Sequence, residues 1–221
     1  MDDRAQVDKL IRRWFLIIVG LSFGILVILR ISLKVEDFPL YWFIRGAGII
    51  GYLSVFLTSL SSAYMRALTI YLRSPFIKVH HGAAVAGLVM LIFHGGSVAW
   101  DMDSIKVFLP RFDSPMLFLE LGGRPAILLV GIASVGAVLR SSLGQKWRII
   151  HWLNYIAFWL GTSHALLIGT TFRHGIIRLV SLSMALGLMI LFVWKRLQQR
   201  RLRAKTAPLA ATAPGRRSAT G

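Results

Sequence analysis

Long apolar stretches separated by short polar segments are the main pattern along this chain. A membrane-spanning helix needs about 20 predominantly apolar residues. Six segments are predicted to be such helices, the fourth of them short: 14–33, 46–64, 79–100, 125–139, 149–170 and 176–194. The first is too long for the apolar core of a signal peptide and has no small-residue cleavage site after it, so we interpret it as a retained helix. The expected fold is an all-α integral membrane protein, a bundle of six transmembrane helices.

The distribution of basic residues predicts how the bundle is oriented. With a cytoplasmic N-terminus, 18 of the 26 lysines and arginines lie in inside segments and eight lie outside. The positive-inside rule therefore places both termini in the cytoplasm and the protein in the cell (inner) membrane. Residues 1–13 form a cytoplasmic N-terminus, residues 14–194 form the membrane domain, and residues 195–221 form a basic tail. We expect this tail to favour anionic lipid and to be disordered beyond its first helical turns.

Composition narrows the function classes. Hydrophobic residues make up 56% of the chain and charged residues 16%, which favours a membrane protein with lipid as its surroundings. The absence of cysteine excludes disulfides, thiolate metal sites and iron–sulfur clusters. The net charge of +17 does not indicate nucleic-acid binding, because the basic residues lie between apolar runs. No glycine-rich dinucleotide fingerprint or phosphate loop occurs, and the tail is too short for a flavin or nicotinamide domain.

Five of the six histidines lie in two predicted helices. The third helix carries His80, His81 and His94, and the fifth carries His151 and His164. Ionisable groups inside membrane helices are costly and are therefore functional candidates. Neutral imidazole is a common metal ligand and binds haem iron axially.

The spacing of these histidines is nearly the same on the two helices. His80 and His94 are fourteen residues apart, a rise of ~21 Å, and lie within ~40° of one another on one face. His151 and His164 are thirteen residues apart, a rise of ~19.5 Å. Because the third and fifth helices run in the same direction, the two helices could hold one haem near each leaflet. Each iron would take one histidine from each helix.

Two features of this arrangement stay open. On an ideal helix, His151 and His164 point ~140° apart, so either the fifth helix contains a kink or π-bulge, helped by Gly161, or the two haem planes differ in orientation. His81 also lies thirteen residues from His94, so a register with His81 in place of His80 remains an alternative.

Two motifs resemble those of the ferric reductase-like transmembrane domain family. One is Val79-His80-His81-Gly82 followed by Phe93-His94, and the other is Gly144-Gln145-Lys146-Trp147-Arg148-Ile149-Ile150-His151, continuing through Asn154-Tyr155 to His164. The resemblance covers residues 46–170. The family includes NADPH oxidases and the haem-binding subunit of a periplasmic methionine sulfoxide reductase system.

The resemblance implies a cofactor and its ligands. It implies b-type haem between the third and fifth helices, bound by His80 with His151 and by His94 with His164, with two haems favoured over one. Because the chain is similar to the short sulfoxide-reductase subunit and has no fused flavin domain, FMN or FAD would act through a partner. Among the basic residues that flank the inner histidines, Arg73 and Arg148 are candidate partners of the haem propionates.

These observations predict an electron-transfer haem subunit of a membrane oxidoreductase. Electrons would pass from a cytoplasmic flavin reductase or quinol to an outside acceptor, either a periplasmic or extracellular reductase partner or ferric iron. A transporter or proton channel with a histidine proton relay and no haem is the alternative. An assembly factor with vestigial ligands is a third hypothesis.

Overall fold

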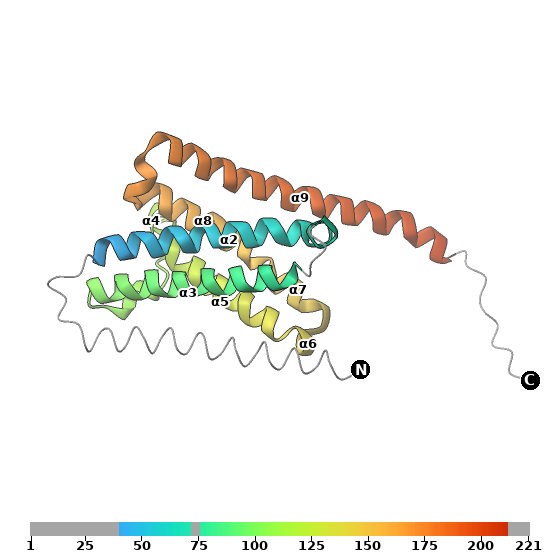
Figure 1. The fold of residues 1–221 in the computed structure, drawn as a ribbon, viewed down its shortest axis with the longest axis horizontal. Helices are drawn as coiled ribbons and strands as arrows, with labels where there is room; N and C mark the ends of the chain where they lie inside the picture. The colour runs from blue at the N-terminus through green and yellow to red at the C-terminus, as the bar shows by residue number, and fades with distance from the viewer. Residues whose placement is uncertain (1–39, 72–75, 212–221) are drawn as a thin grey trace, which may run out of the picture.

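The structure is a computed structural model that describes residues 40–71 and 76–211 (Figure 1). Within these ranges all regular secondary structure is helical, which confirms the predicted helical class. The predicted first helix at 14–33, the N-terminal segment before it and residues 212–221 lie outside the described residues.

Two long helices, α2 (Leu40–Tyr71) and α3 (Ile77–Asp101), lie side by side and antiparallel (Figure 1). They approach closely: a Cβ added to Gly87 of α3 would lie 2.6 Å from the Cβ of Ser54 on α2. Small residues permit such contacts between membrane helices, where close packing drives association. The glycines and serines of α2 and α3 thus allow the backbones to approach.

Short helices connect α3 to the second half of the bundle. A loop with a 3₁₀ turn at Ile105–Phe108 and α4 (Pro115–Glu120) leads to α5 (Gly123–Val138). The chain then turns back through three short elements: α6 (Arg140–Leu143), a 3₁₀ turn at Gly144–Lys146 and α7 (Trp147–His151). These lead into the longer helix α8 (Leu153–Ile168), which packs along α5.

The last helix, α9 (Gly175–Ala211), follows a 3₁₀ turn at Thr170–Arg173 and packs on α8 and α2. Phe158 of α8 and Leu188 of α9 are each only 2% exposed at the centre of this contact. The helix continues well past the bundle (Figure 1). It therefore extends farther into the basic tail than the composition predicted.

Five of the six predicted spans fall within the described residues, and three to four candidate spans are found there. Within the described residues, three helical segments are long and apolar enough to cross a membrane: Phe43–Met65, Ile77–Asp101 and Gly175–Arg201. A fourth is added if α5 and the helical run Arg140–Ile168 form one broken span, bent by 79°. Helices α5 and α8 have 16 residues each, ~24 Å, which is shorter than the ~30 Å apolar core of a bilayer. The chain has the helices of a membrane protein, with three to four candidate spans in its described part.

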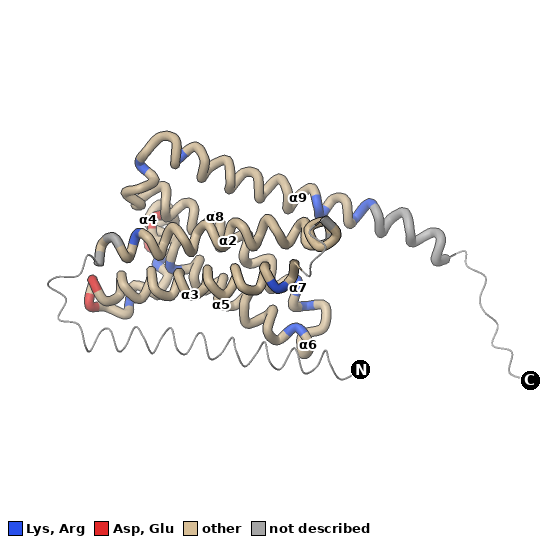
Figure 2. Tube along the Cα trace, in the orientation of Figure 1, with Lys and Arg blue, Asp and Glu red and all other residues tan. Residues whose placement is uncertain are grey.

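Among the described residues, acidic side chains are confined to one end of the bundle, whereas lysines and arginines lie at both ends (Figure 2). All acidic residues in the described part lie at one end, which we call the acidic end: Asp101, Asp103, Asp113 and Glu120. The opposite end, which we call the basic end, holds the start of α3, the α6–α7 turn and the middle of α9. Its cations include Lys78, Lys146, Arg148, Lys195 and Arg196.

Candidate functional site: two histidine pairs

The structure brings four of the candidate histidines together as two pairs. At the basic end, the ring centres of His80 on α3 and His151 on α7 are 6.5 Å apart. At the acidic end, the ring centres of His94 on α3 and His164 on α8 are 6.3 Å apart. Helix α3 therefore contributes one histidine to each pair, and the α7–α8 run contributes the other.

The separation within each pair has the size required for a shared metal. Metal–imidazole bonds are ~2.0–2.1 Å long, so two rings on opposite sides of one metal have centres ~6 Å apart. The observed separations are 6.5 and 6.3 Å. No hydrogen bond joins the two rings in either of these described pairs. A direct proton relay within a pair would need such a bond.

At the acidic end, both rings are anchored by backbone carbonyls. The Nδ1 of His94 donates to the carbonyl oxygen of Ile44 at 2.9 Å, and the Nδ1 of His164 donates to that of Glu120 at 2.7 Å. A carbonyl oxygen only accepts, so the proton of each neutral ring lies on Nδ1. The Nε2 of each ring then carries a lone pair. Metal-ligating histidines in proteins usually have this arrangement.

Glycines bring the backbone close to these two rings. A Cβ at Gly48 of α2 would lie 2.9 Å from the Nδ1 of His94, and one at Gly123 of α5 would lie 3.0 Å from Cδ2 of His164. A side chain at Gly48 would require the His94 ring to shift, and one at Gly123 would press on His164. The space around the acidic-end pair is thus reserved for the imidazoles.

At the basic end, His80 is buried and held by a serine from α2. Its Nδ1 is 3.2 Å from the Oγ of Ser61, and Ser61 donates its single hydroxyl proton to the carbonyl oxygen of Thr58 at 3.1 Å. Because a serine hydroxyl has one donor, Ser61 accepts from the Nδ1–H of His80. The Nε2 of His80 therefore also carries a lone pair.

His151 differs from the other three histidines. The side-chain amide nitrogen of Asn154 lies 3.3 Å from its Nδ1 and donates to it, and the backbone of Ala133 also hydrogen-bonds the ring. In this arrangement Nδ1 accepts, so the proton of the neutral ring lies on Nε2. The same amide nitrogen donates to the carbonyl oxygen of His151 at 3.2 Å, which favours this orientation of the amide. Asn154 thus sets the tautomer of His151.

A helix break accounts for the direction of His151. Helix α7 ends at His151 and α8 begins at Leu153, with Trp152 between them. The amide of Trp152 is shared between the carbonyl oxygens of Arg148 and Ile149 at 3.2 and 3.1 Å. The predicted irregularity therefore exists, but next to His151 rather than at Gly161. Gly161 lies inside the regular helix α8.

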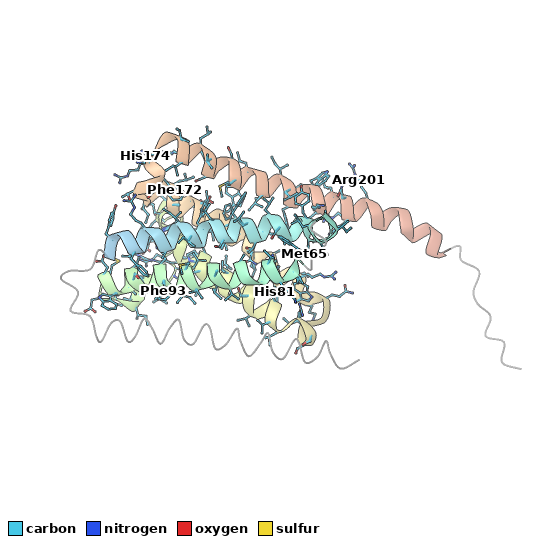
Figure 3. The ribbon with its side chains drawn as sticks, in the orientation of Figure 1. Met65, His81, Phe93, Phe172, His174 and Arg201 are labelled. Carbon is cyan, nitrogen blue, oxygen red and sulfur yellow. The ribbon has the colours of Figure 1, made fainter. Side chains whose placement is uncertain are left out.

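The remaining candidates lie around a cavity at the basic end. This cavity of about 1270 Å³ borders His80, His81 and His151 and is also lined by Arg148. His81 is partly exposed, its ring centre lies 5.9 Å from that of His80, and it projects at the basic end of α3 (Figure 3). His80 is 8% exposed and faces the His151 ring. Arg73 lies outside the described residues.

Several residues that contact the site were not predicted as its members. Ser61 lies on α2, which carries no histidine, so no spacing pattern pointed to it. Arg45 follows Ile44, and its Nε and Nη2 donate to the Oγ1 of Thr171 at 3.1 and 2.6 Å. This clamp joins the start of α2 to the α8–α9 turn beside the carbonyl that holds His94. An arginine at a predicted helix boundary was the only available signal.

Hydroxyl groups near the acidic-end pair have structural partners. Thr162 and Ser163 donate to backbone carbonyls one turn earlier, at 2.8 and 3.1 Å. Arg124, at the start of α5, donates to the carbonyl oxygens of Lys106 and Leu109. His174 is exposed at the turn before α9 (Figure 3). Unlike these residues, Ser61 and Asn154 bond an imidazole directly.

Within the described ranges, no group of three or more His, Cys, Asp or Glu side chains could hold a metal ion. A group with two axial protein ligands is compatible with that finding, since axial ligation of haem takes two side chains. Comparison of the chain with protein-family models, with curated proteins and with solved structures gives no match. In its described part the chain is thus an all-helical protein with three to four helices that could cross a membrane and with two histidine pairs, and any further assignment depends on the chemistry of those pairs.

Proposed function

We propose that this protein is a membrane haem b subunit that carries electrons between the two ends of its helical bundle. The observation that carries the proposal is the repeated pair geometry: ring centres 6.5 and 6.3 Å apart at two depths along α3. In three of the four rings the hydrogen bond at Nδ1 leaves the Nε2 lone pair for a metal.

The residues present fit b-type haem by their chemistry. His80 and His151 would hold one haem, and His94 and His164 would hold a second, with the anchored Nδ1 groups orienting the rings. Bound haem supplies one-electron chemistry, and two imidazole ligands leave no axial position for oxygen. Arg148 at the basic-end cavity is suited to a haem propionate, because it is exposed and lies beside His151 in that cavity.

The direction of transfer follows from the distribution of basic residues. By the positive-inside rule the basic end is cytoplasmic, so the donor is a cytoplasmic flavin reductase or quinol. The acceptor at the acidic end is a reductase partner or ferric iron. The chain would then be the membrane subunit of an oxidoreductase of the ferric reductase-like kind.

An absorption spectrum of the purified full-length protein tests this proposal. After expression with adequate haem, we expect a b-type Soret band that shifts on reduction with dithionite, and about two haems per chain. A colourless protein that does not take up added haem would reject the proposal and leave the proton-relay alternative. A spectrum of high-spin haem with an open axial position would reject the paired ligation.

A further inference from the structure

The basic end is a cationic surface beside the histidine pair at which electrons would enter. The cavity of about 1270 Å³ is lined by five cationic side chains and by no aspartate or glutamate: Arg140, Lys146, Arg148, Lys195 and Arg196. Every acidic residue of the described part lies at the opposite end of the bundle (Figure 2). Lysines and arginines occur at both ends, but at the basic end no described carboxylate balances them, and this net positive charge attracts an anionic partner.

Aromatic rings hold several of these cations in place. The guanidinium of Arg196 lies 3.5 Å from the ring centre of Trp152, and the ammonium of Lys195 lies 5.0 Å from the ring centre of Tyr64. Cation–π contacts of this kind lower the mobility of long side chains. The cations at the cavity mouth are therefore preorganised, which reduces the entropy lost on binding.

The length of α9 indicates what size of partner the surface fits. From Trp194 the helix continues to Ala211, a further ~25 Å at 1.5 Å per residue. Arg200 and Arg201 are exposed on this extension, and Figure 3 shows Arg201 on the part of α9 that projects past the rest of the bundle. The headgroup layer on each side of a bilayer is only ~5–8 Å thick. With the apolar span ending at Trp194, as the sequence predicts, these arginines lie ~9–10 Å farther along the helix and reach past that layer toward soluble molecules.

We propose that the basic end is the docking surface for an acidic, soluble redox protein that donates electrons to the pair His80–His151. This inference rests on the proposed function and names the chemistry of its donor. The carboxylates of the partner contact the arginines of α9 and the rim of the cavity, which places its redox group near His81 and Trp147 at the cavity wall. Each encounter oxidises the donor by one electron and reduces one ferric haem iron to the ferrous state.

The docking proposal is tested by measuring how fast a soluble electron donor reduces the haem in membranes without charged lipid. The full-length protein is placed in phosphatidylcholine nanodiscs, and its haem is reduced either by an acidic flavodoxin in the hydroquinone form or by dithionite. We expect the flavodoxin rate to fall at least about tenfold between low and high salt, as for other electrostatically steered encounters. The double variant Arg200→Glu with Arg201→Glu should lose a similar factor at low salt.

A matched control lies on the other end of the same structure. Arg173→Glu with Arg178→Glu changes the same number of charges, with Arg178 on α9 itself, and should leave the flavodoxin rate unchanged. A flavodoxin rate insensitive to salt, or equally reduced in both double variants, would overturn the proposal. The proposal would also be overturned if Arg200→Glu with Arg201→Glu no longer co-purified with anionic phospholipid but was still reduced by flavodoxin at the original rate. The surface would then be a lipid-binding surface.

Failure of the docking proposal can be distinguished from failure of the proposed haem function. The haem spectrum of each variant is measured first, and dithionite reduction should proceed equally in all of them. If the protein binds no haem, the proposed function fails, and fluorescence titration with flavodoxin still measures whether Arg200→Glu with Arg201→Glu weakens binding by about tenfold. If haem is present and both the rate and the binding are unchanged in that variant, the docking proposal alone fails.

Discussion

The two histidine pairs have nearly the same ring separation but are held by different means. At the acidic end, Nδ1 of His94 and of His164 each bond a backbone carbonyl. At the basic end, side chains help to hold both rings: His80 bonds the hydroxyl of Ser61, and His151 bonds the amide of Asn154 as well as the backbone of Ala133. Backbone anchors cannot be altered by substitution at the anchoring position, whereas side-chain anchors can. The acidic-end pair is therefore the fixed site and the basic-end pair the adjustable one.

Surroundings reinforce this difference. Backbone at Gly48 and Gly123 closes on the acidic-end rings and leaves no room for a Cβ at Gly48. The basic-end pair instead borders cavities of about 40 and 1270 Å³. An open site is more accessible to ligands and electron donors. The reduction potential of a cofactor in a closed site is less affected by changes at the protein surface. Under the proposed function, the open basic-end pair suits the site at which electrons enter, and the closed acidic-end pair suits the site that passes them on.

The largest expected effect is the loss of a ligand. His164→Ala and His80→Ala should each remove about half of the haem, because each variant deprives one site of an axial ligand and spares the other. The haem content per chain is measured by the pyridine haemochrome spectrum. His81→Ala is the control and should keep its haem, since His80 is the ring that faces His151. Equal loss in His81→Ala, or none in the other two, would contradict the pairing.

A smaller effect is expected from closing the space beside the fixed site. Gly48→Ala should weaken haem binding at the acidic end about tenfold or more, because the new Cβ meets the His94 Nδ1 at 2.9 Å and disturbs its bond to Ile44. Haem titration of the apo-protein measures this. Gly131→Ala and Gly161→Ala are matched controls, since a Cβ at either meets nothing within 4 Å. If Gly48→Ala binds haem like these controls, the backbone does not set this site.

How much the sequence could predict differs between the two pairs. Helix rise alone matched the depths of His80 and His94 to those of His151 and His164, and the structure brings these residues together. The anchors were not predictable in the same way. A backbone carbonyl such as that of Ile44 has no sequence signal.

The direction of His151 shows a further limit of sequence reasoning. Its orientation depends on a break at Trp152, where a tryptophan gives no reason to expect an irregular turn. Likewise, composition predicted an early end of helix in the basic tail, although basic residues, alanine and leucine all favour helix. The helix reaches Ala211. The helix propensity of these residues therefore accounts for the length of α9 better than their polar character does.

At the adjustable basic-end site, we expect a substitution of the side-chain anchor to shift the midpoint potential rather than to remove the haem. Asn154→Asp presents only acceptor oxygens to the Nδ1 of His151, which favours the ligating tautomer and makes the ring a stronger donor to iron. We expect the basic-end midpoint potential to fall by about 40 mV or more, since one hydrogen bond contributes ~1 kcal/mol. Asn154→Leu, which cannot bond the ring, should not lower it. A redox titration resolves the two haems, and an equal fall in both would reject the assignment to one site.

The smallest expected effect concerns an exposed ion pair at the acidic end. The guanidinium of Arg111 donates to Asp113 at 2.9 Å and lowers the pKa of that carboxyl from its ordinary value of 3.8. A lowered pKa means that the pair stabilises the fold above the ordinary pKa, and that this contribution is lost as the pH falls through the lowered value. The relevant window therefore lies below about pH 4. Both side chains are more than half exposed, so the contribution is small.

Asp113→Asn tests whether surface charge reaches the fixed site. We expect its Tm at about pH 7 to differ from that of the unsubstituted protein by about 1 °C or less, and the difference to shrink as the pH falls below about 4 and the carboxyl becomes protonated. The acidic-end midpoint potential should be unchanged, because the rings of His94 and His164 are held by backbone groups rather than by this loop. A shift of that potential by more than about 20 mV, roughly half of what one hydrogen bond contributes, would mean that the outer loop tunes the pair. The division into a fixed and an adjustable site would then be wrong.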